Sequence, residues 1–258
     1  MGLFSYEIPE LLAMKSYPKQ IFYDGNSELL KRRKVSIVGS RKPTTYSRTY
    51  TQKIASLLAK EDVCVVSGGA IGIDAVAHYG AGASNTIAVL PCAIDVRYPA
   101  INKNLLNDIQ KSGLLLSQFE EGFCATSWSF VVRNELVVAL GEVLIVGEAE
   151  IDSGTMRSVE FALKMGKKIF VLPQRLGESG GTSRLLKEGR AETIYDIEEF
   201  VSRFSTCVSI QPKNEDEFVL YCATNPTYDE AVAKFPQRVF EAELSGDIKV
   251  VNGRVVKL

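Results

Sequence analysis

Six short runs rich in Val, Ile and Leu, separated by longer stretches with helical spacing, limit the possible folds of this chain more than any other feature. The runs show no polar alternation, as expected of strands buried on both faces. Repeated strand–helix–strand units form a parallel sheet with helices on both faces. The sequence therefore predicts a doubly wound, mostly parallel α/β fold, with strands at 35–38, 63–66, 86–90, 114–116, 143–146 and 169–172.

The hydrophobic rhythm of the sheet ends at residue 204, and a second module is expected beyond it. Residues 205–217 are mostly polar and include Pro212, which predicts a linker. Residues 218–258 suggest short helices followed by a hairpin with Asn252-Gly253 as its tight turn, a winged-helix-like arrangement. Six basic against eight acidic residues over 213–258 favour protein contact over phosphate binding there.

Positive charge is concentrated in one block of the chain. The net charge is −1, yet residues 31–60 hold nine Lys and Arg and no Asp or Glu. One basic block on an otherwise acidic chain predicts a local site for a polyanion. We expect Lys53 and Lys60 only to solvate a helix face, whereas Arg41 and Lys42 directly follow the first predicted strand.

Metal, redox and membrane functions are not expected. The five cysteines form no CxxC pair and read as inert thiols, while the single His78 reads as a packed or solvated imidazole. We expect neither a metal site nor a cofactor. No run approaches the roughly 20 apolar residues of a membrane helix. The first residues show no signal-peptide stretch, so a cytoplasmic protein is expected.

Polar and glycine-rich turns follow three of the predicted strands. Ligands of open α/β sheets bind beyond the carboxyl ends of the strands, so these turns should meet at one edge. Glycines let backbone N–H groups approach an anion, and each following helix offers unpaired donors. We therefore predict an anion site formed by Gly39, Ser40, Arg41, Lys42, Ser67, Gly68, Gly69, Ser153, Gly154 and Thr155.

Several common enzyme signatures are absent from the sequence. The first turn, GSRKPT, is not the GxGxxG of dinucleotide-binding proteins, and no GxxxxGK[ST] of P-loop proteins occurs. There is no GxSxG elbow, and one histidine leaves no plausible catalytic triad.

The strings VSIVGSRKPTTYS and VVSGGAIGIDAVAH resemble the DNA-processing DprA/Smf family, whose hallmark is G-S/T-R after one strand and then SGGA-x-G-x-D. AVLPCAIDVRYP, SFVVRNELVVAL and SGTMRSVEFALKMGKKIFVLPQ continue the likeness in order over roughly 35–190. The resemblance implies a Rossmann-like domain at 35–204, with residues 1–34 as the lead-in to this extended domain. It also implies a non-enzymatic protein of natural transformation and recombination that binds and protects incoming single-stranded DNA and helps to load RecA.

The resemblance also implies roles for individual residues. Gly39, Ser40 and Arg41 resemble the phosphate-gripping turn, and Ser67, Gly68 and Gly69 the second turn of the same pocket. Phe130 resembles an aromatic that stacks on a base, with core packing as the alternative, and the lone Trp128 shares this ambiguity. Arg133 and Asn134, which follow Phe130, are also expected to bind DNA. A homodimer is implied too, and binding of duplex DNA is left open.

Two departures from the family concern charge. Relatives often read RNR where this chain has Arg133-Asn134-Glu135, and CATSWSF lacks the lysine that relatives can carry in this loop. We expect weaker affinity, or binding shifted toward residues 31–48.

A nucleotide-processing enzyme on a related fold is the alternative. Phosphoribohydrolases typically show PGGxGTxxE, with a glutamate three residues past the threonine. Here Glu160 falls five residues past Thr155, on another side of the predicted helix, which counts against this alternative.

Overall fold

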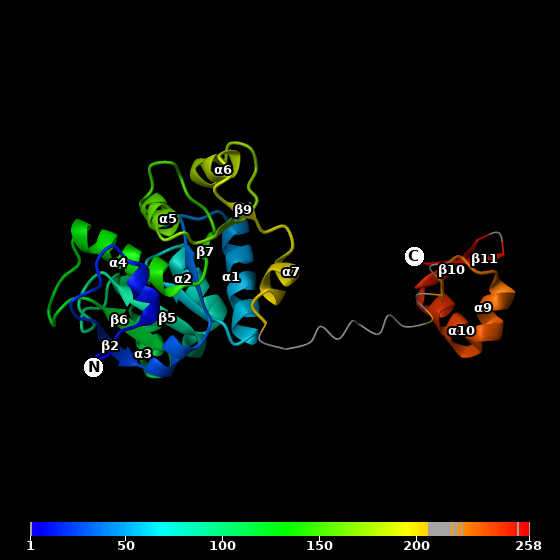
Figure 1. Cartoon of the computed structure of the whole chain (residues 1–258), viewed down its shortest axis with the longest axis horizontal. Helices are drawn as coiled ribbons and strands as arrows, with labels where there is room; N and C mark the ends of the chain where they lie inside the picture. Colours follow the sequence, from blue (N-terminus) through cyan, green and yellow to red (C-terminus); the bar gives the residue numbers. More distant parts are fainter. Residues whose placement is uncertain (1, 206–217, 219–220, 223, 252, 258) are drawn as a thin grey trace. The chain divides into compact units, whose positions relative to one another are not determined.

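The computed structural model describes residues 2–205, 218, 221–222, 224–251 and 253–257. It divides the chain into two compact units, Met1–Thr206 and Cys207–Leu258 (Figure 1). Of the predicted linker at 205–217, residues 206–217 lie outside the described residues.

A nine-stranded sheet forms the centre of the first unit, in the order β1-β2-β6-β5-β4-β3-β7-β8-β9. Its strands from β6 to β9 are parallel, while β2 pairs antiparallel with β6 and β1 with β2. The strands are β1 (Gly2–Leu3), β2 (Phe22–Gly25), β3 (Lys34–Val38), β4 (Cys64–Ser67), β5 (Thr86–Leu90), β6 (Leu114–Ser117), β7 (Leu144–Val146), β8 (Ile169–Val171) and β9 (Glu192–Thr193). The predicted doubly wound, mostly parallel sheet is confirmed.

Helices cover both faces of this sheet. Alternate side chains of β3, such as Val35 and Ile37, pack toward one face, and Val38 packs toward the other. The first face is covered by α1 (Thr45–Lys60), α2 (Ile73–Ala81), α3 (Lys103–Ser112) and α7 (Ile197–Ser202). The second is covered by α4 (Ser127–Leu140), α5 (Gly154–Lys164) and α6 (Gly180–Lys187).

The lead-in at the start of the chain belongs to the same unit. It contains β1, β2 and the 3-10 helices η1 (Pro9–Ala13) and η2 (Ser27–Lys31). Leu11 and Leu29 are fully buried in the core beside α4. Two more 3-10 turns, η3 (Ala83–Asn85) and η4 (Ala100–Asn102), flank β5 and α3.

The winding of the sheet reverses at β3. From β3 the chain steps through β4 and β5 to β6, then returns to the other side of β3 with β7 and continues outward to β9. The helices that follow β3 and β7, α1 and α5, therefore lie on opposite faces of the sheet. This opens a crevice at the carboxyl ends of the two strands. This switch point positions the site described below.

The second unit has its own small core, in which Phe218, Val239, Ile248 and Val255 are buried. Its described elements are α9 (Tyr228–Lys234), α10 (Pro236–Ser245), β10 (Ile248–Val251) and β11 (Arg254–Lys257). The two strands pair antiparallel, so the expected helices and hairpin are present; Asn252 of the expected turn lies outside the described residues.

No helix in the described ranges is long and apolar enough to span a membrane.

Candidate functional site

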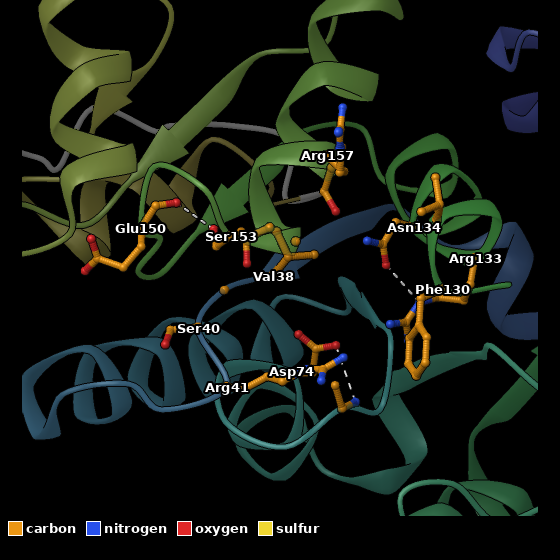
Figure 2. A pocket seen from close by; sticks show the side chains of 16 residues that line it. Val38, Ser40, Arg41, Asp74, Phe130, Arg133, Asn134, Glu150, Ser153 and Arg157 are labelled. Carbon is orange, nitrogen blue, oxygen red and sulfur yellow. Dashed lines mark hydrogen bonds between the residues drawn. The ribbon is translucent and has the colours of Figure 1, made fainter. Parts of the chain in front are cut away.

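A cavity of about 460 Å³ opens at the switch point between β3 and β7. Its walls come from the turn after β3, from the outer side of α4 and from the start of α5. Figure 2 shows the side chains that approach from these separate segments. The lining residues include Gly39, Ser40, Arg41, Asp74, Phe130, Arg133, Asn134, Ser153, Gly154, Thr155 and Arg157. Nine of the residues predicted for the site are therefore brought together here.

The turn after β3 is held in place by hydrogen bonds of its backbone. The Ser40 amide donates to the Glu148 carbonyl at 2.8 Å, and the Ser40 hydroxyl accepts from the Lys42 amide at 3.0 Å. The Glu148 carboxylate accepts from the amide and the hydroxyl of Thr44, both at 2.9 Å. A carboxylate of the protein therefore occupies the entry to α1, so this turn offers an incoming anion the Arg41 side chain rather than the α1 terminus.

The aromatic ring of Phe130 lies between two arginines. The guanidinium carbon of Arg41 is 5.3 Å from the ring centre and that of Arg133 is 5.8 Å away. Phe130 also meets Tyr98 edge-on at 5.7 Å, beside a smaller cavity of about 60 Å³. Phe130 is half-buried and lines both cavities, so its ring is not an interior core residue.

Arg133 is buried, and its guanidinium is hydrogen-bonded within the wall of the cavity. Its guanidinium donates to the carbonyls of Gly68 and Val89 and to the Asn134 side chain. The Asp74 carboxylate, which accepts from the Gly68 amide at 3.2 Å, interacts with the same cation. Burial lowers the pKa of Arg133, and Asp74 opposes that shift. Such a cation positions Phe130 and Asn134 rather than offering a free contact.

The same burial also shifts the pKa of Asp74, the acid of this pair. Removal from water raises the pKa of the Asp74 carboxyl, while Arg133 and the amides of Ala70 and Gly68 oppose that shift. Gly68 is required beside them, because a Cβ at this position would overlap the Arg133 guanidinium. The glycine thus serves close side-chain packing, not a phosphate.

The amino terminus of α5 faces the cavity without a side-chain cap. Ser153 is its N-cap residue, but the Ser153 hydroxyl donates to the Glu150 carbonyl at 2.7 Å instead. A Cβ built on Gly154 would meet no atom within 4 Å, so the backbone here is openly accessible. The first amides of a helix lack partners and carry the positive end of its dipole, which makes this terminus suited to an anion.

Four predicted residues do not line the main cavity, and one of them, Gly68, borders the smaller cavity instead. Ser67 is fully buried and its hydroxyl donates to the Ile37 carbonyl at 2.7 Å, so the prediction that it offers a hydroxyl at the rim is wrong. Gly69 has a φ of 69° and its carbonyl accepts from Asn102 at 2.9 Å. Lys42 is exposed beside the opening and is not part of its lining.

The basic block at 31–60 is divided by the structure. Its first four members lie around the start of β3, away from the cavity, and form ion pairs with Glu28, Asp62, Glu142 and Glu10. Lys53 pairs with Glu198. Within the described ranges no ion pair involves Arg41, Lys42, Arg48 or Lys60. The block as a whole is therefore not one polyanion surface, because acids already pair with its first four members and with Lys53.

Other residues noted in the sequence have structural roles. His78 is buried and its Nδ1 lies 2.6 Å from the Thr86 hydroxyl; burial lowers its pKa to about 3. Burial raises the pKa of Cys64 to about 12 and of Cys92 to about 11. No group of three or more His, Cys, Asp and Glu side chains in the described part could hold a metal ion.

The sequence reasoning missed Arg157, Tyr98 and Asp74. Arg157 lines the cavity from the second turn of α5 and forms a 3.0 Å ion pair with Glu160. It stands in the family-like stretch SGTMRSVEFALKMGKKIFVLPQ, and its place four residues after the predicted Ser153 puts it on the same side of a helix.

Comparison with known proteins gives a family match over most of the chain. The family model of DNA recombination-mediator protein A matches residues 2–205. The DNA processing protein DprA of Streptococcus pneumoniae is 37% identical over 176 residues, or 67% of this chain and 62% of that protein. A putative DprA of Mycobacterium tuberculosis is 35% identical over 70% of this chain and 48% of its own length. The chain thus spans about half to three fifths of these curated relatives.

Solved structures agree with this match. The structure of DNA processing protein A from Helicobacter pylori, studied for its single-stranded DNA binding mode, is 39% identical, covers 78% of this chain and 94% of its own, and superposes with a TM-score of 0.77. DprA from Streptococcus pneumoniae is 32% identical in its crystal structure, covers 80% of this chain and 75% of its own, with a TM-score of 0.73.

Proposed function

The chain belongs to the DNA recombination-mediator protein A family, and on that premise we propose that it binds single-stranded DNA in the cavity at the switch point of its sheet. The proposal rests on one observation above all: the Arg41 guanidinium and the Phe130 ring meet at the opening of a cavity that is also lined by the uncapped start of α5. A cation and amide donors suit a phosphate, and an aromatic face suits a base.

Phosphate binding is assigned to two of the cavity walls. Arg41 presents a planar fork that can bind two phosphate oxygens at once. Gly154 and Thr155 present the first amides of α5 from the opposite side. Each wall offers a small number of donors, so each protomer should neutralise a few phosphates rather than a long stretch of backbone.

Base binding is assigned to Phe130. Its ring is held at fixed distances from Arg41, Arg133 and Tyr98, and it still borders both cavities. Stacking on an aromatic ring accepts any base, and it requires a base that is not already paired in a duplex. This arrangement favours single strands without a sequence preference.

A binding role fits the cavity better than the enzymatic alternative. Glu160, the acid nearest the phosphoribohydrolase motif, is engaged by Arg157 and is not among the cavity's lining residues. Asp74 lines the cavity, but it is committed to Arg133 and to the Gly68 and Ala70 amides. We therefore propose a non-enzymatic protein.

The cellular role follows from the family. We propose that the protein acts in the cytoplasm during natural transformation and recombination, where it protects incoming single-stranded DNA and helps to load RecA, and that it works as a homodimer. The H. pylori relative, studied for its single-stranded DNA binding mode, supports the DNA part of this proposal.

Equilibrium binding of labelled oligo-dT, of duplex DNA of equal length and of a mononucleotide tests the proposal. We expect saturable binding of oligo-dT, weaker binding of the duplex, and no conversion of the mononucleotide. Tight mononucleotide binding with release of a free base would contradict it and favour the enzyme.

A further inference from the structure

Trp128 is a large aromatic side chain that remains exposed beside the candidate site. It is the single tryptophan of the chain and is 62% exposed in the first turn of α4, two residues before Phe130. The start of this helix is fixed by a capping box in which Thr126 and Ser129 bond each other's backbone amides. The backbone that carries Trp128 is therefore well positioned.

One side of the indole packs against a stacked pair of phenylalanines. Trp128 meets Phe119 edge-on at 5.8 Å, and Phe119 stacks on Phe123 at 4.4 Å with an interplanar angle of 9°. The Phe123 carbonyl accepts from the Ala93 amide at 2.9 Å, which fixes this phenylalanine pair to the segment after β5. The indole is thus held in place while most of its surface stays open to solvent.

The sheet sets the order of aromatic groups along its carboxyl edge. β3, which carries Arg41, is followed by β4, by β5 with Tyr98 beyond its end, and by β6 with Phe119 beyond its end. Neighbouring strands are about 4.8 Å apart. Phe130 meets Arg41 and Tyr98, and Trp128 meets Phe119, so two aromatic pairs follow one another along this edge from the cavity toward β6.

The charge around Trp128 points to a base rather than a phosphate as its ligand. Residues 119–126 contain Glu120 and Glu121 and no Lys or Arg. The nearby Asp95 carboxylate accepts from the Gly122 amide at 3.2 Å. These acids would repel a phosphate, whereas stacking on an indole needs no positive charge.

We infer that Trp128 is a second base-stacking platform, which receives a base of a single strand that leaves the Arg41–Phe130 cavity toward β6. This inference rests on the proposed function. It extends the contact from the cavity to more than one nucleotide and assigns the outer contact to stacking instead of charge.

Intrinsic fluorescence tests this directly, because all tryptophan emission of the full chain comes from Trp128. Oligo-dT of increasing length is titrated, with binding followed independently by the anisotropy of a labelled strand. We expect emission to be quenched once the strand is long enough to leave the cavity. An abasic oligomer of equal length should bind through its phosphates with little quenching.

Variants complete the test. Trp128→Ala and Trp128→Leu should each weaken binding of long oligo-dT by about tenfold without changing its salt dependence, and Trp128→Phe should restore most of the affinity. Trp128→Leu keeps apolar packing on Phe119, which guards against a folding artefact. Tyr79→Ala is the matched control, since Tyr79 is also 62% exposed but lies near the end of α2, and should leave affinity unchanged.

The outcomes separate this inference from the proposed function. If oligo-dT binds by anisotropy while emission stays constant and Trp128→Ala matches Tyr79→Ala, the stacking platform is refuted and the cavity proposal stands. Equal quenching by the abasic oligomer would also refute it. If the unaltered chain does not bind oligo-dT, the proposed function fails and the inference fails with it.

Discussion

The Arg41 guanidinium carbon lies 5.3 Å from the centre of the Phe130 ring, although the two residues are carried by different elements on opposite faces of the sheet. Arg41 follows β3 in the turn that leads to α1, whereas Phe130 belongs to α4. In the proposed function, their meeting places the group that binds phosphate and the group that stacks on a base at one opening.

Arg41→Ala should weaken binding of single-stranded DNA by about tenfold or more, because a charge-assisted, two-pronged contact is lost. Arg41→Lys keeps the charge but not the planar fork, and should recover only part of the affinity. Fluorescence anisotropy with labelled oligo-dT measures both. Lys60→Ala, at the far end of α1, is the control and should change little. Equal losses from Arg41→Ala and Lys60→Ala would mean that general positive charge does the binding.

Gly154→Ala should weaken DNA binding without destabilising the fold, since alanine is the better helix former. The added methyl group meets no protein atom within 4 Å, so it obstructs only a ligand that approaches the start of α5. Gly68→Ala provides the contrast, since its methyl group would overlap Arg133 and should lower the free energy of unfolding by about 1–3 kcal/mol. Urea denaturation and anisotropy distinguish the two. Full DNA affinity in Gly154→Ala would remove the α5 terminus from the site.

His78 should make stability fall at acid pH. Burial lowers its pKa to about 3 in the folded state, against an ordinary value of 6.5, so the unfolded chain takes up the proton first. The resulting loss is absent above about pH 6.5, grows as the pH falls toward 3, and amounts to about 2 kcal/mol at pH 5. Urea unfolding near pH 7.5 and pH 5 measures it.

The matched variant for this effect is His78→Leu. The Nε2 atom of His78 has no hydrogen-bond partner in the described part of the chain, and the Thr86 hydroxyl also donates to the Val65 carbonyl. His78→Leu should therefore fold and should lose about 2 kcal/mol less than the unaltered chain between these two pH values. The same pH dependence in both proteins would assign the effect to other groups.

Removal of residues 213–258 should leave a folded sheet unit that still binds single strands. The cavity is lined by residues of the Met1–Thr206 unit, and the removed segment has an excess of acid. Circular dichroism and anisotropy measure the two properties. A truncated protein that is folded yet no longer binds would place the second unit in the DNA site.

Much of the fold could be predicted because most strands of the parallel sheet are marked by a continuous apolar run in the sequence. The six apolar runs all became strands, with ends that differ by at most one residue from those expected. β2 gave no such signal, since Phe22–Gly25 is short, contains Asp24 and ends in glycine. It is a strand because β6 offers it an antiparallel partner more than 80 residues away, through pairs such as Tyr23 with Leu116.

The site was predictable where a turn by itself presents a group, as with Arg41 and Gly154. It was not where a distant contact decides the role. Arg133 was expected to contact DNA, but Gly68 and Asp74 surround its guanidinium in the fold. Ser67 was expected in the anion site, but its hydroxyl donates a hydrogen bond to the Ile37 carbonyl. Both depend on the packing of segments that are about 30 to 65 residues apart.

The measurement that tests the account most directly is the salt dependence of oligo-dT binding, compared with duplex DNA of equal length. A few donors around Arg41 and the start of α5 predict a modest slope of log affinity against log salt, near −0.7 for each phosphate neutralised, and weaker duplex binding. Stacking on Phe130 accepts any unpaired base, so no preference for a duplex sequence is expected. Saturable preference for one short duplex sequence that survives at high salt would contradict the account.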